Sequence, residues 1–466
     1  MDEIRKHIRV VFWLYFVLFA LLAAFLIKFL FFDSRLIITS QYNPRLKLQN
    51  QSITRGDILD ANGKELAYTN KDGSRVYPLG YAAAHAVGYY NAGAASSYGV
   101  EAEYNFAMEN SDSEVIQRLR NIISNDRIRG DSVVLTINAD LQSYIYKQIK
   151  DYKAGVIVLQ PNTGKILAMV SAPSFDPNTL SRDYKSVSAD TDNSPLLNRA
   201  AQGSYPPGSV FKIITTAAAM EYIPDYANIT YVCEGSDTVG GKPIRCFDST
   251  AHGKVNLTKA FTVSCNTFFA NLGVRIGAGR LRAEADQFYF NAALPFPLEY
   301  TQSKFPLDSG SPGSELVDTA IGQGKTMTSP LQMALVTAAV ANDGLLMAPY
   351  IMDHKKGYNG GISGKTVPLL AKRVLSPEIA AGIKDMMVQV TKSGTGSRAA
   401  VPDLEIAAKT GSAQTPTGAD HGWYAAFFPA DNPRYALCIV IENIGGSARV
   451  LPIAKNIIEH LTNLGK

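Results

Sequence analysis

The sequence predicts an α/β protein in which an antiparallel sheet flanked by helices follows an N-terminal membrane-spanning helix and a small, mainly β domain. Three observations lead to this fold class: a long apolar run near the N-terminus, short strand-and-turn patterns after it, and longer strand-like runs separated by helical stretches in the remainder. The 466 residues are 46% hydrophobic and 18% charged, so a large core is expected rather than disorder or a coiled coil.

The first element is an apolar run over residues 10–27, which residues 29–32 extend beyond Lys28. A helix of this length crosses the hydrocarbon core of a bilayer. A cleaved signal peptide has a shorter apolar region that ends in small residues, whereas the far end of this run is bulky. We therefore expect an uncleaved membrane anchor over residues 10–32.

Positive charge is unevenly distributed around the anchor. Arg5, Lys6 and Arg9 precede it, whereas only Lys28 and Arg35 lie close to its far end. The positive-inside rule then predicts a cytoplasmic N-terminus. We expect a single-pass protein of the cell membrane, with a cytoplasmic tail at residues 1–9 and everything after the anchor extracytoplasmic.

Residues 33–150 form the second predicted unit, with a mainly β pattern. Short strands at residues 57–59 and 65–67 flank a plausible hairpin turn at residues 60–63. No group of side chains with evident chemistry occurs in this stretch, so we interpret it as a non-catalytic stalk or docking domain.

The pattern changes near Lys153, and residues 151–466 form the third predicted unit. Strand-like runs at residues 155–159 and 165–170 flank a tight turn at residues 161–164. Further strand-like runs lie at residues 405–408, 422–428 and 435–441, and an amphipathic helix over residues 453–464 closes the chain.

Composition excludes several classes of function. The 45 Lys and Arg against 41 Asp and Glu give a net charge of +4 spread along the chain, which is too little for a nucleic-acid-binding surface. Four Cys cannot form a disulfide scaffold, and the six His and the Cys match no His-Glu-x-x-His or paired Cys-x-x-Cys motif. We therefore expect no nucleic-acid partner, no metal and no other cofactor.

The cysteines and two of the histidines have modest expectations. Cys233 and Cys246 bracket a Gly-rich loop in an oxidising compartment, and a disulfide between them is left open. Cys265 is expected to be a small buried hydrophobe. His252 and His421 occur in no triad motif and are expected to be surface or loop residues.

Ser209 and Lys212 are the first candidate catalytic pair. Ser209 stands at the start of a helix predicted to continue through residues 217–219, so the two side chains share one helical face. A serine hydroxyl is a weak nucleophile until a base takes its proton. Apolar surroundings and the helix dipole disfavour the charged form of Lys212, which can therefore act as a neutral base.

Two further motifs follow in chain order. Ser264-Cys265-Asn266 is the only Ser-x-Asn in the chain, and the Ser209–Lys212 motif is its only Ser-x-x-Lys. Lys409-Thr410-Gly411-Ser412 completes the set, although Lys392-Ser393-Gly394-Thr395 spells a permitted form of the third motif as well. Lys392 follows a helix predicted over residues 379–390, whereas Lys409 follows a strand-like run, so we favour Lys409.

The three motifs in this order resemble those of the penicillin-binding proteins and serine β-lactamases. The resemblance to class B penicillin-binding proteins extends to residues 55–63, 135–138, 198–200, 322–324 and 329–332. It implies a penicillin-binding transpeptidase domain over residues 151–466 and a non-catalytic, dimerisation-like pedestal over residues 33–150. The pedestal is too short for a glycosyltransferase domain, which disfavours the bifunctional class A. Asn138 departs from the family pattern, where an Asp is usual.

The resemblance also implies roles for the site residues. Ser209 would attack the penultimate D-Ala carbonyl with Lys212 as its base, and the backbone amides of Ser209 and Ser412 would form the oxyanion hole. Ser264 and Asn266 would relay a proton to the leaving D-Ala and hold the peptide. Thr410, with Gly411 and Ser412 of the same motif, would bind the substrate carboxylate, which the charge of Lys409 would face.

The implied activity is that of a membrane-anchored D,D-transpeptidase that cross-links peptidoglycan stem peptides ending in D-Ala-D-Ala and is acylated by penicillin and other β-lactams, with no cofactor. A D,D-carboxypeptidase, a β-lactamase and a β-lactam sensor or scaffold share the fold. The Glu-x-x-Leu-Asn motif of class A β-lactamases is not found after Asn266, and the chain has neither extra spans nor a broken motif. The resemblance further implies a membrane partner, a glycan polymerase of the shape, elongation, division and sporulation (SEDS) family. It leaves open which of these processes the pair serves.

Overall fold

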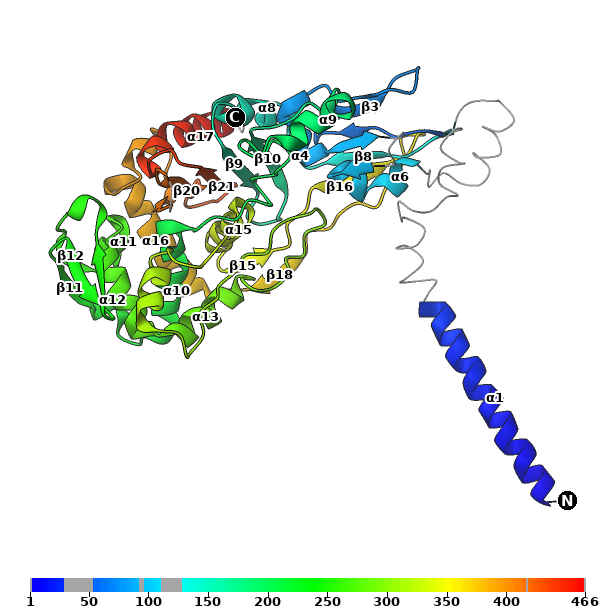
Figure 1. Ribbon diagram of the computed structural model, residues 1–466, viewed down its shortest axis with the longest axis horizontal. Coiled ribbons are helices and arrows are strands. Elements are labelled where there is room, and N and C mark those ends of the chain that lie inside the picture. Colours follow the sequence, from blue (N-terminus) through cyan, green and yellow to red (C-terminus); the bar gives the residue numbers. More distant parts are fainter. Residues whose placement is uncertain (1, 29–52, 92–95, 110–127, 416–417, 465–466) are drawn as a thin grey trace.

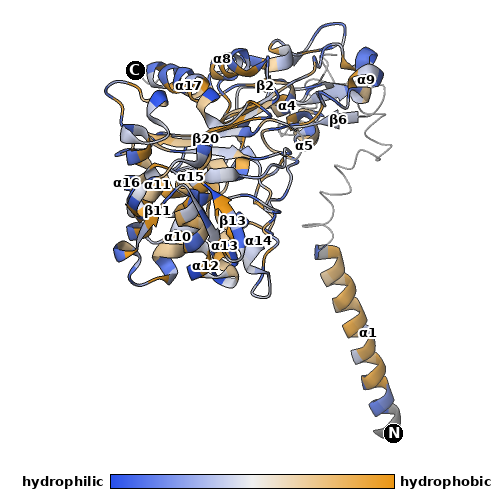
Figure 2. Cartoon of the chain, turned by 60° about the vertical axis from the view of Figure 1, so that its left-hand side comes forward, coloured by the Kyte–Doolittle hydropathy of each residue, from blue (hydrophilic) through white to orange (hydrophobic). Residues whose placement is uncertain are grey.

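The computed structural model describes residues 2–28, 53–91, 96–109, 128–415 and 418–464 (Figure 1). Helix α1 (Asp2–Lys28) contains a candidate membrane span, Arg5–Leu26. Its surface is apolar along most of its length (Figure 2). The predicted apolar helix is therefore confirmed, whereas its predicted extension at residues 29–32 and Arg35 lie outside the described residues.

A five-stranded antiparallel sheet with strand order β10-β9-β21-β20-β19 forms the centre of the larger part of the molecule. Its strands are β9 (Ala154–Leu159), β10 (Ile166–Ala172), β19 (Ala407–Ala413), β20 (His421–Phe428) and β21 (Tyr435–Ile441). Four of them match the predicted runs closely. The fifth begins later than predicted and runs through the Lys409 motif itself.

Helices cover both faces of this sheet (Figure 1). Alternate side chains of a strand point to opposite faces, so Val156 and Val158 pack against α8 (Ala139–Ile149) and α17 (Leu451–Leu464). Ile157 and Leu159 belong to the core on the other face, where α10 (Lys212–Tyr222), α15 (Pro330–Ala341) and α16 (Pro377–Ser393) lie. Asn138, the departure from the family pattern, caps α8 by accepting hydrogen bonds from the amides of Asp140 and Leu141.

A second group of elements lies at the end of the molecule away from the N-terminal sheet (Figure 1). It contains α11 (Leu257–Thr262), α12 (Asn266–Ile276), α13 (Ala278–Gln287) and α14 (Gly313–Ala320). Two antiparallel strand pairs complete it: β11 (Thr230–Cys233) with β14 (Gly253–Asn256), and β12 (Ser236–Val239) with β13 (Lys242–Arg245).

The N-terminal part contains a six-stranded sheet with strand order β17-β16-β8-β2-β3-β4. Its strands are β2 (Ile58–Leu59), β3 (Glu65–Thr69), β4 (Arg75–Val76), β8 (Ser132–Leu135), β16 (Met352–Lys356) and β17 (Ile362–Ser363). The antiparallel β2–β3 pair is the hairpin that the sequence predicts. The antiparallel pairing of β16 with β8 is not predicted, because it joins segments far apart in the chain.

Shorter elements complete the described chain. They are β1 (Ile53–Thr54), β5 (Tyr89–Asn91), β6 (Ser96–Tyr98), β7 (Ile128–Arg129), β15 (Leu345–Met347), β18 (Leu370–Arg373), α4 (Ala84–Val87), α5 (Val100–Glu103), α6 (Asn105–Glu109) and α9 (Leu180–Ala189). Helices α5 and α6 supply the acidic members of a buried ion cluster. Arg55 contacts Glu101 at 2.7 Å and Glu109 at 3.1 Å, and Arg75 contacts Glu101 at 2.8 Å.

Candidate active site

Ser209 lies, half-buried, in the 3₁₀ helix η3 (Gly208–Phe211), which leads directly into α10 at Lys212. The sequence predicts one continuous helix here, and the structure differs in winding its first turn more tightly. Residues i and i+3 are eclipsed in 3₁₀ geometry, so Ser209 and Lys212 follow one another along one face. Lys212 is fully buried.

Two glycines bring this turn against strand β19. Gly208 has a φ of +55°, and a Cβ atom there would lie 2.5 Å from the carbonyl oxygen of Ser412. A Cβ atom on Gly411 would lie 3.1 Å from the amide nitrogen of Val210. Only glycine allows the two backbones to approach this closely. The turn that carries Ser209 is therefore placed beside residues 410–412.

Ser264 lies between α11 and α12 in an unusual backbone conformation, with a φ of +58°. This region is sparsely populated by residues other than glycine and costs on the order of 1–3 kcal/mol. The Nζ atom of Lys212 donates to the Ser264 carbonyl oxygen at 2.8 Å, to its Oγ at 3.3 Å and to the Oδ1 of Asn266 at 2.7 Å. Lys212 therefore joins the first and second motifs directly.

Lys409 reaches the same serine from strand β19. Its Nζ donates to Ser264 Oγ at 2.9 Å and to the Thr410 carbonyl oxygen at 3.2 Å, and its side chain is fully buried. Lys392, at the end of α16, is more than half exposed and pairs with Glu405 at 2.6 Å. The structure thus brings Lys409, and not Lys392, together with Ser264 and Lys212.

The two lysines are buried against uncharged acceptors. Burial lowers the pKa of Lys212 to about 7, and the nearby Cys265 and Cys246 oppose this effect in part. Burial and the nearby charge of Lys212 hold the pKa of Lys409 well below its usual range. Because like charges disfavour one another, the two ammonium groups titrate as a coupled pair, and a neutral amine is available near pH 7.

Strand β19 lies at the edge of the five-stranded sheet, with one side paired to β20. An edge strand has backbone donors and acceptors free to pair with an extended peptide. Thr410 is buried, and Ser412 is half-buried with its Oγ accepting from the Ser447 amide at 3.0 Å. The third motif therefore combines an edge strand, suited to pairing with an extended peptide, with a buried lysine.

Two site contacts are missed by the sequence analysis. Thr395 Oγ1 lies 2.6 Å from Thr410 Oγ1, so the loop that carries the rival motif touches the site through its last residue. Gln323 Nε2 lies 3.4 Å from the Ser412 carbonyl oxygen. Gln323 lies in residues 322–324, one of the stretches that resemble class B penicillin-binding proteins. This resemblance is the sequence signal that could have indicated its place in the site. Thr395 enters the sequence analysis only as the last residue of the alternative third motif at residues 392–395.

The arrangement suits acyl transfer from a peptide that ends in a carboxylate. It offers a serine hydroxyl, a lysine that can be neutral near pH 7, a hydroxyl that two lysines share, and an edge strand beside them. Side chains suited to a metal ion, three cysteines and a histidine, lie next to Ser264 rather than at Ser209.

Comparison with known proteins supports this assignment. Residues 154–459 match the family model of the penicillin binding protein transpeptidase domain, and residues 55–133 match that of the penicillin binding protein A dimerisation domain. The chain is 35% identical over 453 residues to the peptidoglycan D,D-transpeptidase PbpA of Mycolicibacterium smegmatis, covering 89% of this chain and 90% of that protein. It is 31% identical over 392 residues to the peptidoglycan D,D-transpeptidase MrdA of Haemophilus influenzae, covering 76% of this chain and 59% of that protein.

Solved structures agree. The penicillin G acyl-enzyme complex of penicillin-binding protein A from M. tuberculosis superposes with a TM-score of 0.80 at 32% identity, covering 88% of this chain and 99% of that one. The family resemblance and the fold class that the sequence predicts are thereby confirmed. The transpeptidase model spans well over half of the chain, and the chain is therefore a class B penicillin-binding protein and belongs to the peptidoglycan D,D-transpeptidase family.

Proposed function

We propose that Ser209 is the nucleophile of a membrane-anchored peptidoglycan D,D-transpeptidase and that Lys212 is its base. The observation that carries this proposal is the placement of Lys212 at the centre of the site. It lies fully buried in the turn after Ser209, with its Nζ 2.7 Å from Asn266 Oδ1 and 3.3 Å from Ser264 Oγ. A lysine whose pKa is about 7 can take up the serine proton at neutral pH.

The first half-reaction forms an ester. Ser209 Oγ attacks the carbonyl carbon of the penultimate D-Ala while Lys212 takes its proton. The backbone amides of Ser209 and Ser412 stabilise the oxyanion. Ser264, within hydrogen-bond reach of both lysines, passes a proton to the amine of the terminal D-Ala, which leaves as the C–N bond breaks.

The second half-reaction restores the serine. The amine of another stem peptide attacks the ester carbonyl and gives up a proton to the same relay, and Ser209 Oγ leaves with a proton from Lys212 as the ester C–O bond breaks. A new amide then links the two peptides. Penicillin carries a carboxylate and a reactive amide like those of D-Ala-D-Ala, so it acylates Ser209 and remains bound as an ester.

Substrate binding falls to strand β19. An extended stem peptide pairs with the free edge of this strand, and its terminal carboxylate accepts from Thr410, with Gly411 and Ser412 alongside. Lys409 supplies the only charge that the third motif directs into the site, and an arriving carboxylate favours its protonated form. Asn266 holds the peptide amide from the opposite side.

The proposal extends to the domain arrangement. We assign residues 33–150 to a pedestal that resembles a dimerisation domain and residues 151–466 to the transpeptidase domain. The pairing of β16 with β8 ties the two through main-chain hydrogen bonds. With residues 1–9 in the cytoplasm and 10–32 in the cell membrane, the catalytic domain is extracytoplasmic. Anchor and pedestal are then the surfaces for a SEDS-family glycan polymerase.

Labelling with a fluorescent penicillin tests the nucleophile. Wild-type protein in detergent is expected to carry one covalent adduct on the peptide containing Ser209, and Ser209→Ala is expected to carry none while it melts at the same temperature. Ser204→Ala, at an exposed serine just before the motif, is the matched control and should label normally. Equal labelling of Ser209→Ala would overturn the assignment.

The acceptor is tested separately, with a donor peptide ending in D-Ala-D-Ala and a second peptide that carries a free side-chain amine. A transpeptidase produces the cross-linked dimer together with D-Ala. Release of D-Ala without any dimer, at every acceptor concentration, would identify a D,D-carboxypeptidase instead.

A further inference from the structure

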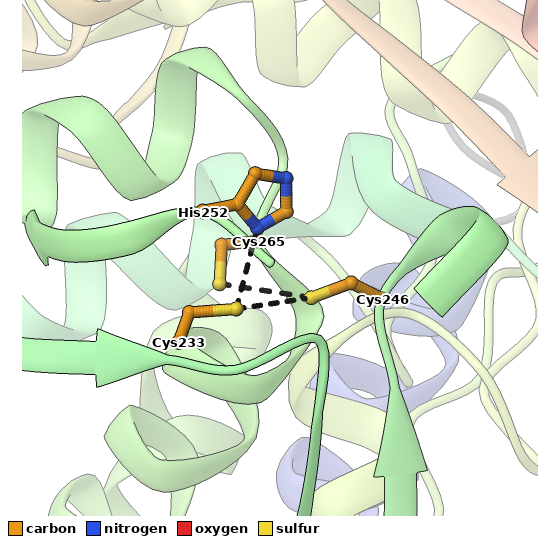
Figure 3. A group of neighbouring side chains, drawn as sticks. All are labelled: Cys233, Cys246, His252 and Cys265. Atoms are coloured by element: carbon orange, nitrogen blue, oxygen red, sulfur yellow. Dashed lines mark hydrogen bonds between the residues drawn. The ribbon is translucent and has the colours of Figure 1, made fainter. Parts of the chain in front are cut away.

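Three of the chain's four cysteines gather with one histidine beside the active site (Figure 3). Cys233 Sγ lies 3.7 Å from Cys246 Sγ and 3.4 Å from His252 Nδ1, and Cys246 Sγ lies 3.8 Å from Cys265 Sγ. All four candidate ligand atoms lie within 4.8 Å of one another. The disulfide that the sequence left open does not form in the structure, because both thiols are free.

These distances match a tetrahedral metal site. With Zn–S bonds of about 2.3 Å and Zn–N bonds of about 2.0 Å, tetrahedral angles place sulfur atoms about 3.8 Å apart and sulfur about 3.5 Å from nitrogen. Three of the six ligand separations, at 3.7, 3.8 and 3.4 Å, agree with these values to about 0.1 Å, and all six lie within 4.8 Å. Figure 3 shows the three sulfur atoms and Nδ1 pointing toward a common centre.

The surroundings also suit a bound cation. Cys233, Cys246 and Cys265 are buried and His252 is half-buried, so the ligands close the site on most sides. Thr267 is fully buried and donates from Oγ1 to Cys233 Sγ at 3.2 Å, and its Oγ1 lies 3.3 Å from Cys265 Sγ. Hydroxyl contacts of this kind orient sulfur ligands from outside the first coordination shell.

The four candidate ligands lie on separate elements of the local fold, which a bound metal would connect. Each ligand lies at the end of a different element: Cys233 ends β11, Cys246 follows β13, His252 precedes β14 and Cys265 precedes α12. Two-stranded sheets are marginally stable on their own. A metal bound at these four ends would tie the two strand pairs to the start of α12.

We propose that Cys233, Cys246, His252 and Cys265 bind one Zn²⁺ ion as a structural site that positions the Ser264–Asn266 segment. Four protein ligands leave no open position, so the ion holds structure and takes no part in the acyl transfer. Binding releases one proton from each thiol, and His252 coordinates in its neutral form. This site is separate from the catalytic serine and needs no change in the proposed reaction.

The proposed zinc site is linked to the active site by the backbone of residues 264–266. Cys265 is the middle residue of the second motif, between Ser264 and Asn266, and both neighbours accept hydrogen bonds from Lys212. The left-handed φ of Ser264 persists only if its surroundings hold it there. A metal bond to the adjacent residue supplies that restraint. These residues are therefore positioning residues rather than catalytic ones.

The metal is tested on the full chain in detergent, purified under reducing conditions without chelator. We expect one equivalent of zinc by elemental analysis. Exchange for Co²⁺ should give the intense visible bands of a tetrahedral site together with thiolate-to-cobalt charge-transfer absorption. Absence of stoichiometric metal both as purified and after incubation with Zn²⁺ or Co²⁺ would overturn the proposal. So would an intact mass lower by two hydrogens, with a peptide that links Cys233 to Cys246.

Variants assign the ligands. His252→Ala changes a half-buried loop residue and is expected to lower zinc affinity at least about tenfold in competition with a chromophoric chelator. Cys233→Ser should abolish the charge-transfer band. Cys438→Ser removes a buried cysteine of strand β21, and His421→Ala removes a histidine outside the cluster; both should bind metal as the wild type does. Equal loss of metal from ligand and control variants would refute the assignment.

The coupling to catalysis has its own readout. Removal of zinc is expected to slow penicillin acylation at least about threefold, and added Zn²⁺ should restore the rate in wild type but not in His252→Ala. An unchanged rate without metal would overturn the positioning role. Failure of Ser209 labelling in all proteins would instead count against the proposed function, because metal content is measured independently.

Discussion

Two clusters of buried charge in the described part of the chain, one in the N-terminal part and one in the active site, are built in opposite ways. In the N-terminal part, Arg55 and Arg75 each contact the fully buried Glu101, so every buried cation has a carboxylate beside it. In the active site, Lys212 and Lys409 are fully buried, and their ammonium groups donate hydrogen bonds to serine, threonine and asparagine oxygens.

The difference separates structure from function. Burial alone would raise the pKa of Glu101, but Arg75 and Arg55 outweigh it and hold that pKa below its ordinary value, so the cluster stays charged. In the active site, burial lowers the pKa of both lysines because no carboxylate compensates it. The matched cluster, in which each buried cation has a carboxylate beside it, stabilises the fold. The unmatched cluster, formed by the two active-site lysines, can instead accept a proton or bind an anion.

The largest effect is expected from unbalancing the matched cluster. Glu101→Gln leaves two arginines buried with one fewer negative charge, and removal of one partner from a buried ion pair costs about 3–5 kcal/mol. At about 2–4 °C per kcal/mol, calorimetry should show the melting temperature falling by at least about 6 °C. Glu103→Gln, at an exposed position of the same helix, should melt like the wild type.

The acylation rate of folded Glu101→Gln should stay near that of the wild type, because the cluster makes no contact with the site residues. A melting temperature equal to that of Glu103→Gln would mean that the cluster contributes no net stability, and the contrast between the two regions would fail.

The second prediction removes charge from the unmatched cluster. A charge-assisted contact between Lys409 and the penicillin carboxylate should contribute on the order of 1.5–3 kcal/mol. Lys409→Ala should therefore lower the second-order rate of acylation at least roughly tenfold, since about 1.4 kcal/mol corresponds to a factor of ten. Circular dichroism confirms that the variant is folded before the rate is measured.

Lys392→Ala is the matched control, since Lys392 begins a stretch that spells the same motif but is exposed and paired with Glu405. Its charge near a helix end contributes at most about 1 kcal/mol of local stability, so acylation should proceed at nearly the wild-type rate. If Lys392→Ala is the variant that acylates slowly, the third motif is the one at Lys392 rather than the one at Lys409. The proposed roles of Thr410 and Ser412 would then be wrong as well.

The third prediction concerns pH. Burial lowers the pKa of Lys212 to about 7, the nearby Cys265 and Cys246 oppose this effect in part, and Lys409 is the neighbouring basic group. Only neutral Lys212 can take the proton of Ser209, so acylation should rise as pH rises and should increase about tenfold between pH 6 and pH 8. Lys212→Arg, which stays charged throughout, should show no such rise. A flat wild-type profile over this range would exclude Lys212 as the base.

The central sheet could be predicted from the sequence because its strands are buried apolar runs. The strand-like run predicted at residues 405–408 begins two residues before β19 and ends before the Lys409–Ser412 motif, since that motif contains polar and small residues that are typical of a loop. These residues form a strand because Lys409 points into a buried site where Ser264 accepts its hydrogen bond. Local pattern cannot reveal such a partner, which lies far away in the sequence.

The same limit explains the other omissions. The pairing of β16 with β8 depends on segments more than two hundred positions apart, and neither has a distinctive pattern. The four residues of the proposed zinc site are spaced more widely than the short motifs by which metal ligands are usually found. Ser209 and Lys212 could be predicted from their spacing on one helical face, whereas the roles of Ser264 and Lys409 are implied by the family resemblance of the three motifs.

The smallest effect is expected at Thr395, the site contact that the sequence analysis missed. Its hydroxyl lies 2.6 Å from that of Thr410, which we expect to bind the substrate carboxylate. Thr395→Val keeps the shape and removes the hydroxyl, so Thr410 loses the contact that orients its own hydroxyl toward the ligand. A hydrogen bond of this kind contributes about 0.5–1 kcal/mol, so the second-order rate of acylation should fall about two- to fivefold.

The loss from Thr395→Val should appear mainly in the affinity for penicillin rather than in the maximal acylation rate, because Thr395 acts through Thr410 and touches no reacting atom. Ser393→Ala, an exposed position two residues earlier, is the matched control and should leave both quantities unchanged. Burst kinetics over a range of penicillin concentrations separate the two. If Thr395→Val behaves like Ser393→Ala, the loop after α16 merely lies near the site, and only the Lys409 strand belongs to it.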